Sequence, residues 1–231
     1  MAKDNLTVDT PKNQFFNFSF FKIDPIWRWL DDLDKEKSVK EVENIIKNSK
    51  IKFRSYLTIG LRDDTEFLFW YASDMVEEIQ NATSEIYQSF FGRYILPTHV
   101  YLSSTRPPSF YTKGGGGHGW LAGQEQKMYV IVYPLIKTRE WYLLPVKKRR
   151  EMMSEHIEVG KRYPEILLNT TYSIGIHDQD FMLAFETDNL GRFQDLIMDL
   201  RGTQVSAYVL KDTPMIVGIR KDIPTLIKSL G

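Results

Sequence analysis

The sequence predicts an α+β fold built from two fused ferredoxin-like halves, each with the element order βαββαβ. The main observation is an internal repeat. Residues 59–74 and 174–188 both contain an Ile-Gly pair, a polar turn, an apolar strand and then an aspartate. A repeated segment of this kind indicates that one structural unit occurs twice in the chain.

The first half contains a signal for each expected element. Apolar runs predict strands and helical spacing of apolar residues predicts helices. The expected elements are a strand at 15–22, helical pieces within 25–48, the hairpin around Ile59-Gly60, a helix at 75–91 and a strand at 100–103. Asp74 precedes the helix at 75–91, where its carboxylate is suited to accept a hydrogen bond from a free helix N–H.

The second half repeats this order. Its expected elements are a strand at 129–136, a helix at 145–163, the hairpin around Ile174-Gly175, a helix at 190–201 preceded by Asp188, and a strand at 215–219. Helices cover one face of each half-sheet and leave the other apolar face without a partner. We therefore expect the two open faces to pack together as a dimeric α+β barrel within one chain.

A glycine-rich segment separates the halves. Residues 106–125 contain Pro107, Pro108 and four consecutive glycines, a composition typical of a long connection. We expect an N-terminal structural half at 1–110, a connecting loop at 111–127 and a C-terminal half with the binding site at 128–231.

Composition excludes several function classes. The 231 residues include 30 basic and 30 acidic side chains, so bulk charge does not favour nucleic-acid binding. There is no cysteine, which excludes disulfides, zinc–thiolate sites, iron–sulfur clusters and cysteine nucleophiles. No signal-like or membrane-spanning apolar run is found, so a cytoplasmic protein with no membrane span is expected.

His156 is the leading candidate for a metal ligand. It shares one face of the expected helix at 145–163 with Met152, Gly160 and Tyr163, so it should point inward. On these residues alone, a hydrogen-bonded core histidine is the more common outcome. A neutral imidazole is also a common metal ligand.

Several motifs in the second half, in the right order, resemble the chlorite dismutase and coproheme decarboxylase family. They are Tyr133-Pro134-Leu135-Ile136-Lys137, Trp141-Tyr142, Glu155-His156, residues 200–206 and residues 213–218. The resemblance covers about residues 128–220 and implies haem b or coproheme, bound non-covalently with His156 on the iron. It also implies assembly as a homopentamer.

The resemblance assigns roles to further residues. Tyr133 matches a redox-active tyrosine that, after peroxide reacts with the iron, takes a hydrogen atom from a porphyrin propionate. Lys137 would pair with a propionate or move a proton, and Trp141 and Ser206 would contact the cofactor. Without the resemblance, Tyr133 is an ordinary aromatic residue at a strand end and Lys137 an ordinary solvated charge.

Two positions depart from the family pattern. Asn169 stands thirteen residues after His156, where chlorite-splitting members have a distal arginine and decarboxylases often have glutamine. Because asparagine has no positive charge to hold an oxychlorine anion, chlorite dismutation is disfavoured. Gln204 replaces a glutamate that accepts a hydrogen bond from the iron-bound histidine, so a weaker histidine–iron bond is expected.

These observations leave three functions open. The leading one is a haem-dependent oxidoreductase that uses hydrogen peroxide to decarboxylate the propionates of coproheme. The others are a weak haem peroxidase or chlorite dismutase-like protein, and a haem-binding protein without turnover. Tyr133 favours the first, whereas Asn169 and Gln204 favour the others.

Overall fold

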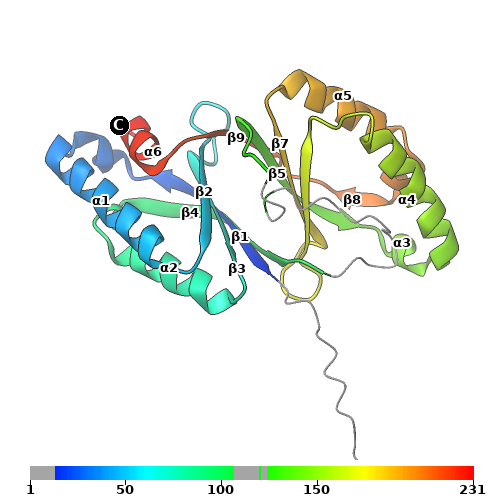
Figure 1. The fold of residues 1–231 in the computed structure, drawn as a ribbon, viewed down its shortest axis with the longest axis horizontal. Coiled ribbons are helices and arrows are strands. Elements are labelled where there is room, and N and C mark those ends of the chain that lie inside the picture. Colours follow the sequence, from blue (N-terminus) through cyan, green and yellow to red (C-terminus); the bar gives the residue numbers. More distant parts are fainter. Residues whose placement is uncertain (1–13, 107–119, 121–123) are drawn as a thin grey trace, which may run out of the picture.

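The structure is a computed structural model that describes residues 14–106, 120 and 124–231. Strands form a central layer, and helices flank it on two sides (Figure 1). One group contains α1, α2 and α6, and the other contains α3, α4 and α5. Residues 107–119 and 121–123 lie outside the described residues, and they include most of the connecting loop expected at 111–127.

The first half has the predicted element order. It consists of β1 (Phe15–Ile23), η1 (Pro25–Trp29), α1 (Asp32–Asn48), β2 (Lys52–Leu57), β3 (Phe67–Ser73), α2 (Val76–Gln88), η2 (Phe91–Arg93) and β4 (Ile95–Ser104). Helix α1 begins where the Asp31 side chain accepts a hydrogen bond from the Asp34 amide at 2.9 Å. This cap satisfies one of the free N–H groups of the first turn.

The second half repeats the order with short additions. It consists of β5 (Tyr129–Lys137), α3 (Arg139–Leu143), α4 (Val146–Gly160), β6 (Leu167–Tyr172), β7 (Phe181–Thr187), α5 (Leu190–Arg201), η3 (Gln204–Tyr208), β8 (Val209–Lys211), β9 (Ile216–Arg220) and α6 (Ile223–Ser229). The predicted helix at 145–163 corresponds to α4.

The two aspartates expected at helix starts have other partners. Helix α5 is capped by Asn189, whose side chain accepts from the Arg192 amide, and Asp188 instead accepts from the Met128 amide at 2.9 Å. Asp74 accepts from Gln14, and the residue at the start of α2 makes no side-chain cap. The capping expectation was therefore wrong by one residue at α5 and wrong outright at α2.

The two half-sheets join at both edges and close into a barrel. Their strand orders are β4-β1-β3-β2 and β6-β7-β5-β9, with antiparallel pairing throughout. Strand β2 pairs with β9 through Leu57 and Ile219, and β4 pairs with β6 through Ser104 and Tyr172. The predicted fold class is confirmed.

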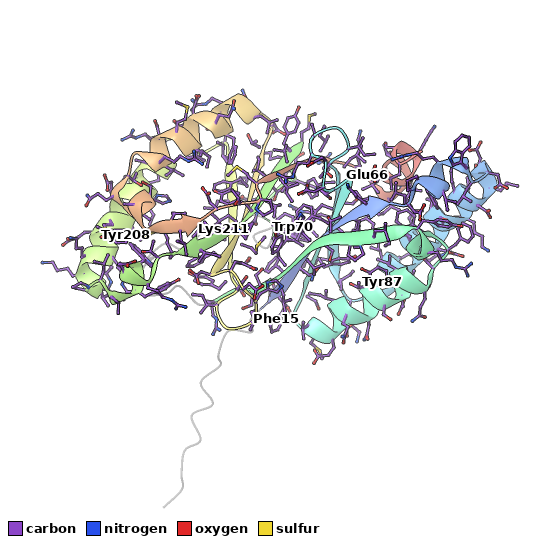
Figure 2. The ribbon with its side chains drawn as sticks, turned by 180° about the vertical axis from the view of Figure 1, so that it is seen from behind. Phe15, Glu66, Trp70, Tyr87, Tyr208 and Lys211 are labelled. Carbon is purple, nitrogen blue, oxygen red and sulfur yellow. The ribbon has the colours of Figure 1, made fainter. Side chains whose placement is uncertain are left out.

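Apolar side chains fill the inside of the barrel and the two outer layers. Trp70 lies near the middle of the molecule, between the two halves, whereas Tyr208 lies far out on the second half (Figure 2). The inner core consists mainly of Phe16, Phe18, Phe20, Tyr56, Leu68, Trp70, Trp120, Val130, Val132, Met182, Ala184 and Ile216. Helix α6 belongs to the outer layer of the first half, where it packs on α1.

Alternation along β5 decides which side chains face the helices of the second half. Val130 and Val132 belong to the inner core, whereas Ile131 and Tyr133 belong to the outer layer that includes Phe193 and Leu196 of α5. Lys137, at the end of β5, contacts Val205 and the Trp141 ring, which form a small apolar cluster with Met152 of α4. This helix-covered side of the second half-sheet is where the candidate site lies.

Candidate functional site

His156 lies on α4 in a partly buried position. Its Nδ1 atom lies 3.3 Å from the hydroxyl oxygen of Thr203. Burial, together with the positive charge of Lys137, lowers the pKa of His156 to about 4, against an opposing effect from Glu155. The imidazole is therefore neutral at pH 7, the form that binds a metal ion.

Lys137 and Trp141 lie beside this histidine. The Lys137 side chain is 9% exposed, and its Nζ atom lies 3.4 Å from the carbonyl oxygen of Val205 and 4.9 Å from the centre of the Trp141 ring. Burial lowers the pKa of Lys137 to about 8, although the charge of Asp180 opposes that shift. The site thus contains a cation that has lost most of its water.

Tyr133 lies in the neighbouring apolar cluster on the same side of the sheet. It is 5% exposed, and its ring stacks on Phe185 with 6.0 Å between ring centres. Burial, and to a smaller degree the charge of Asp212, raises the pKa of Tyr133 well above its usual value, while Arg201 opposes the shift. The phenol stays protonated at neutral pH.

The structure therefore brings His156, Lys137 and Trp141 together and places Tyr133 in the neighbouring outer apolar cluster, four residues before Lys137. This geometry offers an apolar, helix-covered surface with one neutral nitrogen ligand, one cation and one protonated phenol. Among the described residues, no group of three or more histidine, aspartate or glutamate side chains is arranged to hold a metal ion. A single histidine suits a metal whose other ligands come from a cofactor.

Gln204 and Ser206 do not contact His156. Gln204 is exposed, and its backbone amide donates to Glu155 at 3.3 Å. The Ser206 hydroxyl lies 2.7 Å from two backbone carbonyl oxygens in the turn after α5. The expectation that Gln204 accepts from the histidine is wrong, because the adjacent Thr203 occupies that position.

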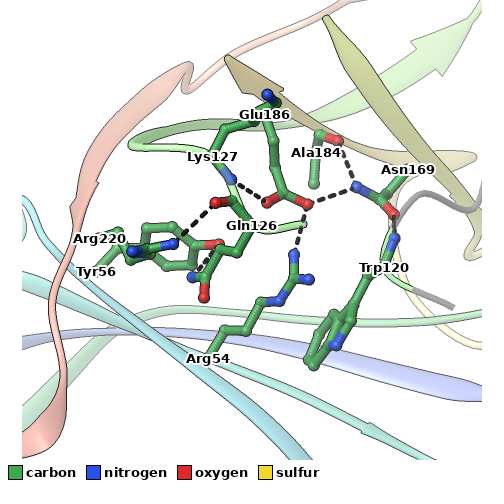
Figure 3. A network of polar contacts seen from close by, with 9 residues as sticks. All are labelled: Arg54, Tyr56, Trp120, Gln126, Lys127, Asn169, Ala184, Glu186 and Arg220. Atoms are coloured by element: carbon green, nitrogen blue, oxygen red, sulfur yellow. Dashed lines mark hydrogen bonds and ion pairs between the residues drawn. The ribbon is translucent and has the colours of Figure 1, made fainter. Parts of the chain in front are cut away.

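Asn169 faces away from the candidate site. It pairs with Ala184 across β6 and β7, and Ala184 pairs with Val132, so this row of residues points into the barrel. The side chain is 2% exposed, accepts from the Trp120 amide at 2.9 Å and donates to Glu186 at 3.1 Å (Figure 3). Its interpretation as a distal residue, and the argument against chlorite chemistry that depended on it, therefore do not hold.

The partners of Asn169 form a buried polar network inside the barrel. The Arg54 guanidinium lies 2.6 Å from the Glu186 carboxylate, and its central carbon lies 4.6 Å from the Trp120 ring centre (Figure 3). Gln126 donates to the Tyr56 hydroxyl at 2.9 Å in the same region. This network joins the two halves and anchors the described part of the connection between them.

Sequence reasoning missed Thr203, Val205 and the Arg54–Glu186 pair. Thr203 and Val205 lie within the motif at 200–206, but the only signal for either was its position beside Gln204. Arg54 and Glu186 each interrupt an apolar strand, and a charge in such a strand requires a partner when it is buried. That signal was present for both residues.

Known proteins are similar to this chain in sequence and in fold. The chain belongs to the chlorite dismutase family, whose model matches residues 35–221. Coproheme decarboxylase from Mycolicibacterium smegmatis is 35% identical over 178 residues, which cover 76% of this chain and 75% of that protein. The resemblance inferred from the motifs is confirmed.

Solved structures agree on the fold. Chlorite dismutase from Candidatus Nitrospira defluvii in complex with imidazole superimposes with a TM-score of 0.85 and 22% identity, covering 94% of each chain. A heme-binding protein from Thermus thermophilus superimposes with a TM-score of 0.84 and 20% identity, covering 96% of each chain. Over the described residues, the helices include none with the length and apolar character of a membrane span.

Proposed function

We propose that this protein is a haem-dependent oxidoreductase that uses hydrogen peroxide to decarboxylate the propionates of coproheme. The observation that carries the proposal is the neutral, partly buried His156 on the same helix-covered side of the sheet as the protonated Tyr133. The similarity to a coproheme decarboxylase over three quarters of both chains supports it.

The residues present fit an iron porphyrin. His156 would be the protein ligand to iron, since neutral imidazole nitrogen is a common axial ligand. Apolar outer-layer side chains such as Leu135, Leu168 and Leu183 would supply apolar contacts to the porphyrin. When bound, the iron porphyrin would supply the oxidising power for reaction with peroxide.

Tyr133 would be the oxidisable group of the protein. Its high pKa keeps the phenol protonated, so the ring loses an electron only together with its proton. Conversion of one propionate carboxylate to a vinyl group releases carbon dioxide, one proton and two electrons. One hydrogen peroxide takes up those two electrons together with two protons and becomes two water molecules. Tyr133 would transfer these two electrons one at a time.

A second candidate function is haem binding without turnover, or weak peroxidase activity. Lys137 favours it, because its ammonium group already contacts Val205 and the Trp141 ring and lies near His156. A lysine held in this way is less available to pair with a propionate. His156 alone would suffice for these functions.

The deciding experiment mixes the apoprotein with iron coproporphyrin and titrates hydrogen peroxide. Porphyrin products are then identified by mass spectrometry. Stepwise loss of the mass of carbon dioxide and two hydrogens supports the decarboxylase. Tight binding with unchanged porphyrin mass contradicts it and favours the second candidate. Haem b in place of coproheme tests which porphyrin is preferred.

We also propose that the second half alone holds the porphyrin and that the protein assembles as a homopentamer. His156 has no histidine counterpart in α1, the helix at the equivalent place in the first half. Analytical ultracentrifugation of the full chain, with and without porphyrin, measures the assembly. A monomer at all concentrations contradicts the pentamer.

A further inference from the structure

We propose that copies of this chain contact one another through two different exposed apolar patches. A patch around Trp29 in the first half of one copy binds a patch around Leu143 in the second half of the next copy. The inference rests on the assembly of several copies proposed above. It does not depend on the porphyrin or on its chemistry.

The first apolar patch lies where η1 leads into α1. It consists of Ile26, Trp29 and Leu33, whose side chains are 59%, 89% and 76% exposed. Ile26 and Trp29 are three residues apart within η1, so they project from the same side of this short 3₁₀ helix. Single exposed apolar side chains are normal, whereas a cluster that contains a largely exposed tryptophan is typical of a binding surface.

The second apolar patch lies at the junction of α3 and α4. It consists of Leu143, Pro145 and Val146, which are all exposed, Leu143 to 82%. Trp141, two residues before Leu143, is 3% exposed and packs with Met152 of α4. The junction therefore buries one large apolar side chain in the fold and presents the next ones to the outside.

Opposite charges surround the two patches. Residues 24–36 contain five acidic and two basic side chains, and one of the basic ones, Arg28, already pairs with Glu66 at 2.7 Å. Residues 139–150 contain five basic side chains and one acidic one, and of the basic ones only Arg149 is buried. The whole chain has 30 basic and 30 acidic residues, so both excesses are local. Complementary charge favours contact between the two patches and disfavours contact of either patch with its own copy.

The positions of the patches determine the kind of assembly. Helices α1 and α3 lie on opposite sides of the molecule, so the two patches of one copy do not meet each other (Figure 1). A contact between two different surfaces leaves one patch of each kind unoccupied at the ends of an open row of copies. All patches are occupied only when the row closes into a ring. The proposed homopentamer is such a ring, whereas a two-fold dimer would join identical patches.

The first test removes the two apolar anchors from the full chain without porphyrin. Trp29→Ala and Leu143→Ala should each raise the concentration needed for half-maximal assembly by at least about tenfold, measured by analytical ultracentrifugation. Both side chains are largely exposed, so the fold should be unaffected. Met198 of α5 is 73% exposed and lies outside both patches, so Met198→Ala is the matched control and should assemble like the wild type.

The second test exchanges the charges of the two patches. One variant combines Asp32→Lys and Glu36→Lys, and another combines Lys147→Glu and Lys148→Glu, all at exposed positions. Each variant alone should lose its assembly, because like charges then meet. A chain with all four changes should assemble again, because the charges are opposite once more. Unchanged assembly of the two separate variants, or no recovery in the combined one, would overturn the proposal.

The third test identifies which patch meets which, and it benefits from a chain without cysteine. The Leu33→Cys and Val146→Cys variants, co-expressed with different tags, are treated with a short thiol-reactive cross-linker. We expect links between the two variants and none when either is expressed alone. Links within either variant alone would overturn the proposal.

The outcomes also separate this inference from the proposals on which it rests. A wild type that assembles while the patch variants behave like it overturns the patch assignment alone. A wild type that is monomeric at all concentrations overturns this inference and the homopentamer together. Neither result bears on the coproheme reaction, which the porphyrin products report separately.

Discussion

The Arg54 guanidinium of the first half lies 2.6 Å from the Glu186 carboxylate of the second half, inside the closed barrel. The two side chains are 9% and 1% exposed, so neither charge is well solvated. Asn169 and the Lys127 amide contact the same carboxylate (Figure 3). The two halves are therefore joined by a buried ion pair as well as by strand pairing.

Removal of one member of this pair should destabilise the fold strongly. Glu186→Gln leaves Arg54 buried without its counter-charge, and we expect a loss of about 3–5 kcal/mol in the free energy of unfolding. Urea denaturation of the apoprotein measures it. The Lys161–Glu158 pair has the same 2.6 Å separation but both side chains are 64% exposed, so Glu158→Gln is a matched control that should cost at most about 1 kcal/mol. Equal effects of the two changes would show that burial is not the cause.

Asn169→Arg should destabilise the protein without producing chlorite activity. The new guanidinium would enter the barrel beside Arg54, where Asn169 now contacts the Trp120 amide and Glu186. Urea denaturation and oxygen evolution from chlorite are the two measurements. A stable variant with increased oxygen evolution would show that this residue faces the porphyrin after all.

His156→Ala should remove the proposed iron ligand and preserve the fold. The residue is partly buried and lies outside the main apolar clusters, so its loss should leave the far-UV circular dichroism spectrum unchanged. The iron–histidine stretching band should disappear from the resonance Raman spectrum of the loaded protein. Met153→Ala, a change elsewhere on α4, is the control and should retain the band.

Tyr133→Phe should separate binding from turnover. It keeps the ring that stacks on Phe185 and removes only the hydroxyl, so porphyrin affinity should stay within about tenfold of the wild type, since one neutral hydrogen bond contributes about 0.5–1.5 kcal/mol. Conversion of coproheme under peroxide should stop. Conversion by the variant at the wild-type rate would rule out Tyr133 as the oxidised group.

Stability of the apoprotein should depend on His156 between about pH 6.5 and pH 4. The folded protein holds the pKa of this ring at about 4, below its ordinary value of 6.5, so the unfolded chain binds more protons within that window. This contribution is fully present above pH 6.5 and is lost as the pH falls towards 4. His156→Gln should therefore have a shallower decrease in unfolding free energy over the same range. Identical pH slopes would contradict the lowered pKa.

The sequence predicts the fold well because the repeat encodes it directly. Each half carries its own strand, hairpin and helix signals, and two sheets with one open face each have few ways to pack. The strand register was harder to infer. Asn169 stands at the family spacing from His156, but only its pairing with Ala184 reveals that it faces the barrel.

The support of His156 was also beyond sequence reasoning. The identity of its partner depends on the turn between α5 and η3, which brings Thr203 towards the ring and leaves Gln204 exposed. A difference of one residue in such a turn changes the acceptor from an amide to a hydroxyl. Local sequence spacing does not determine which residues are in contact when, like His156 and Thr203, they lie 47 positions apart in the chain.

The position of helix α6 determines when the first half can complete its folding during translation. Ile223, Leu226 and Ile227 of this helix, together with Leu230 directly after it, complete the outer apolar layer of the first half, although they follow all strands of the second half in the sequence. During translation, part of the apolar surface of the first half therefore stays exposed until residues 223–230 have been synthesised. The duplicated units have thus lost their independence: neither half, expressed separately, contains all the residues that cover the first sheet.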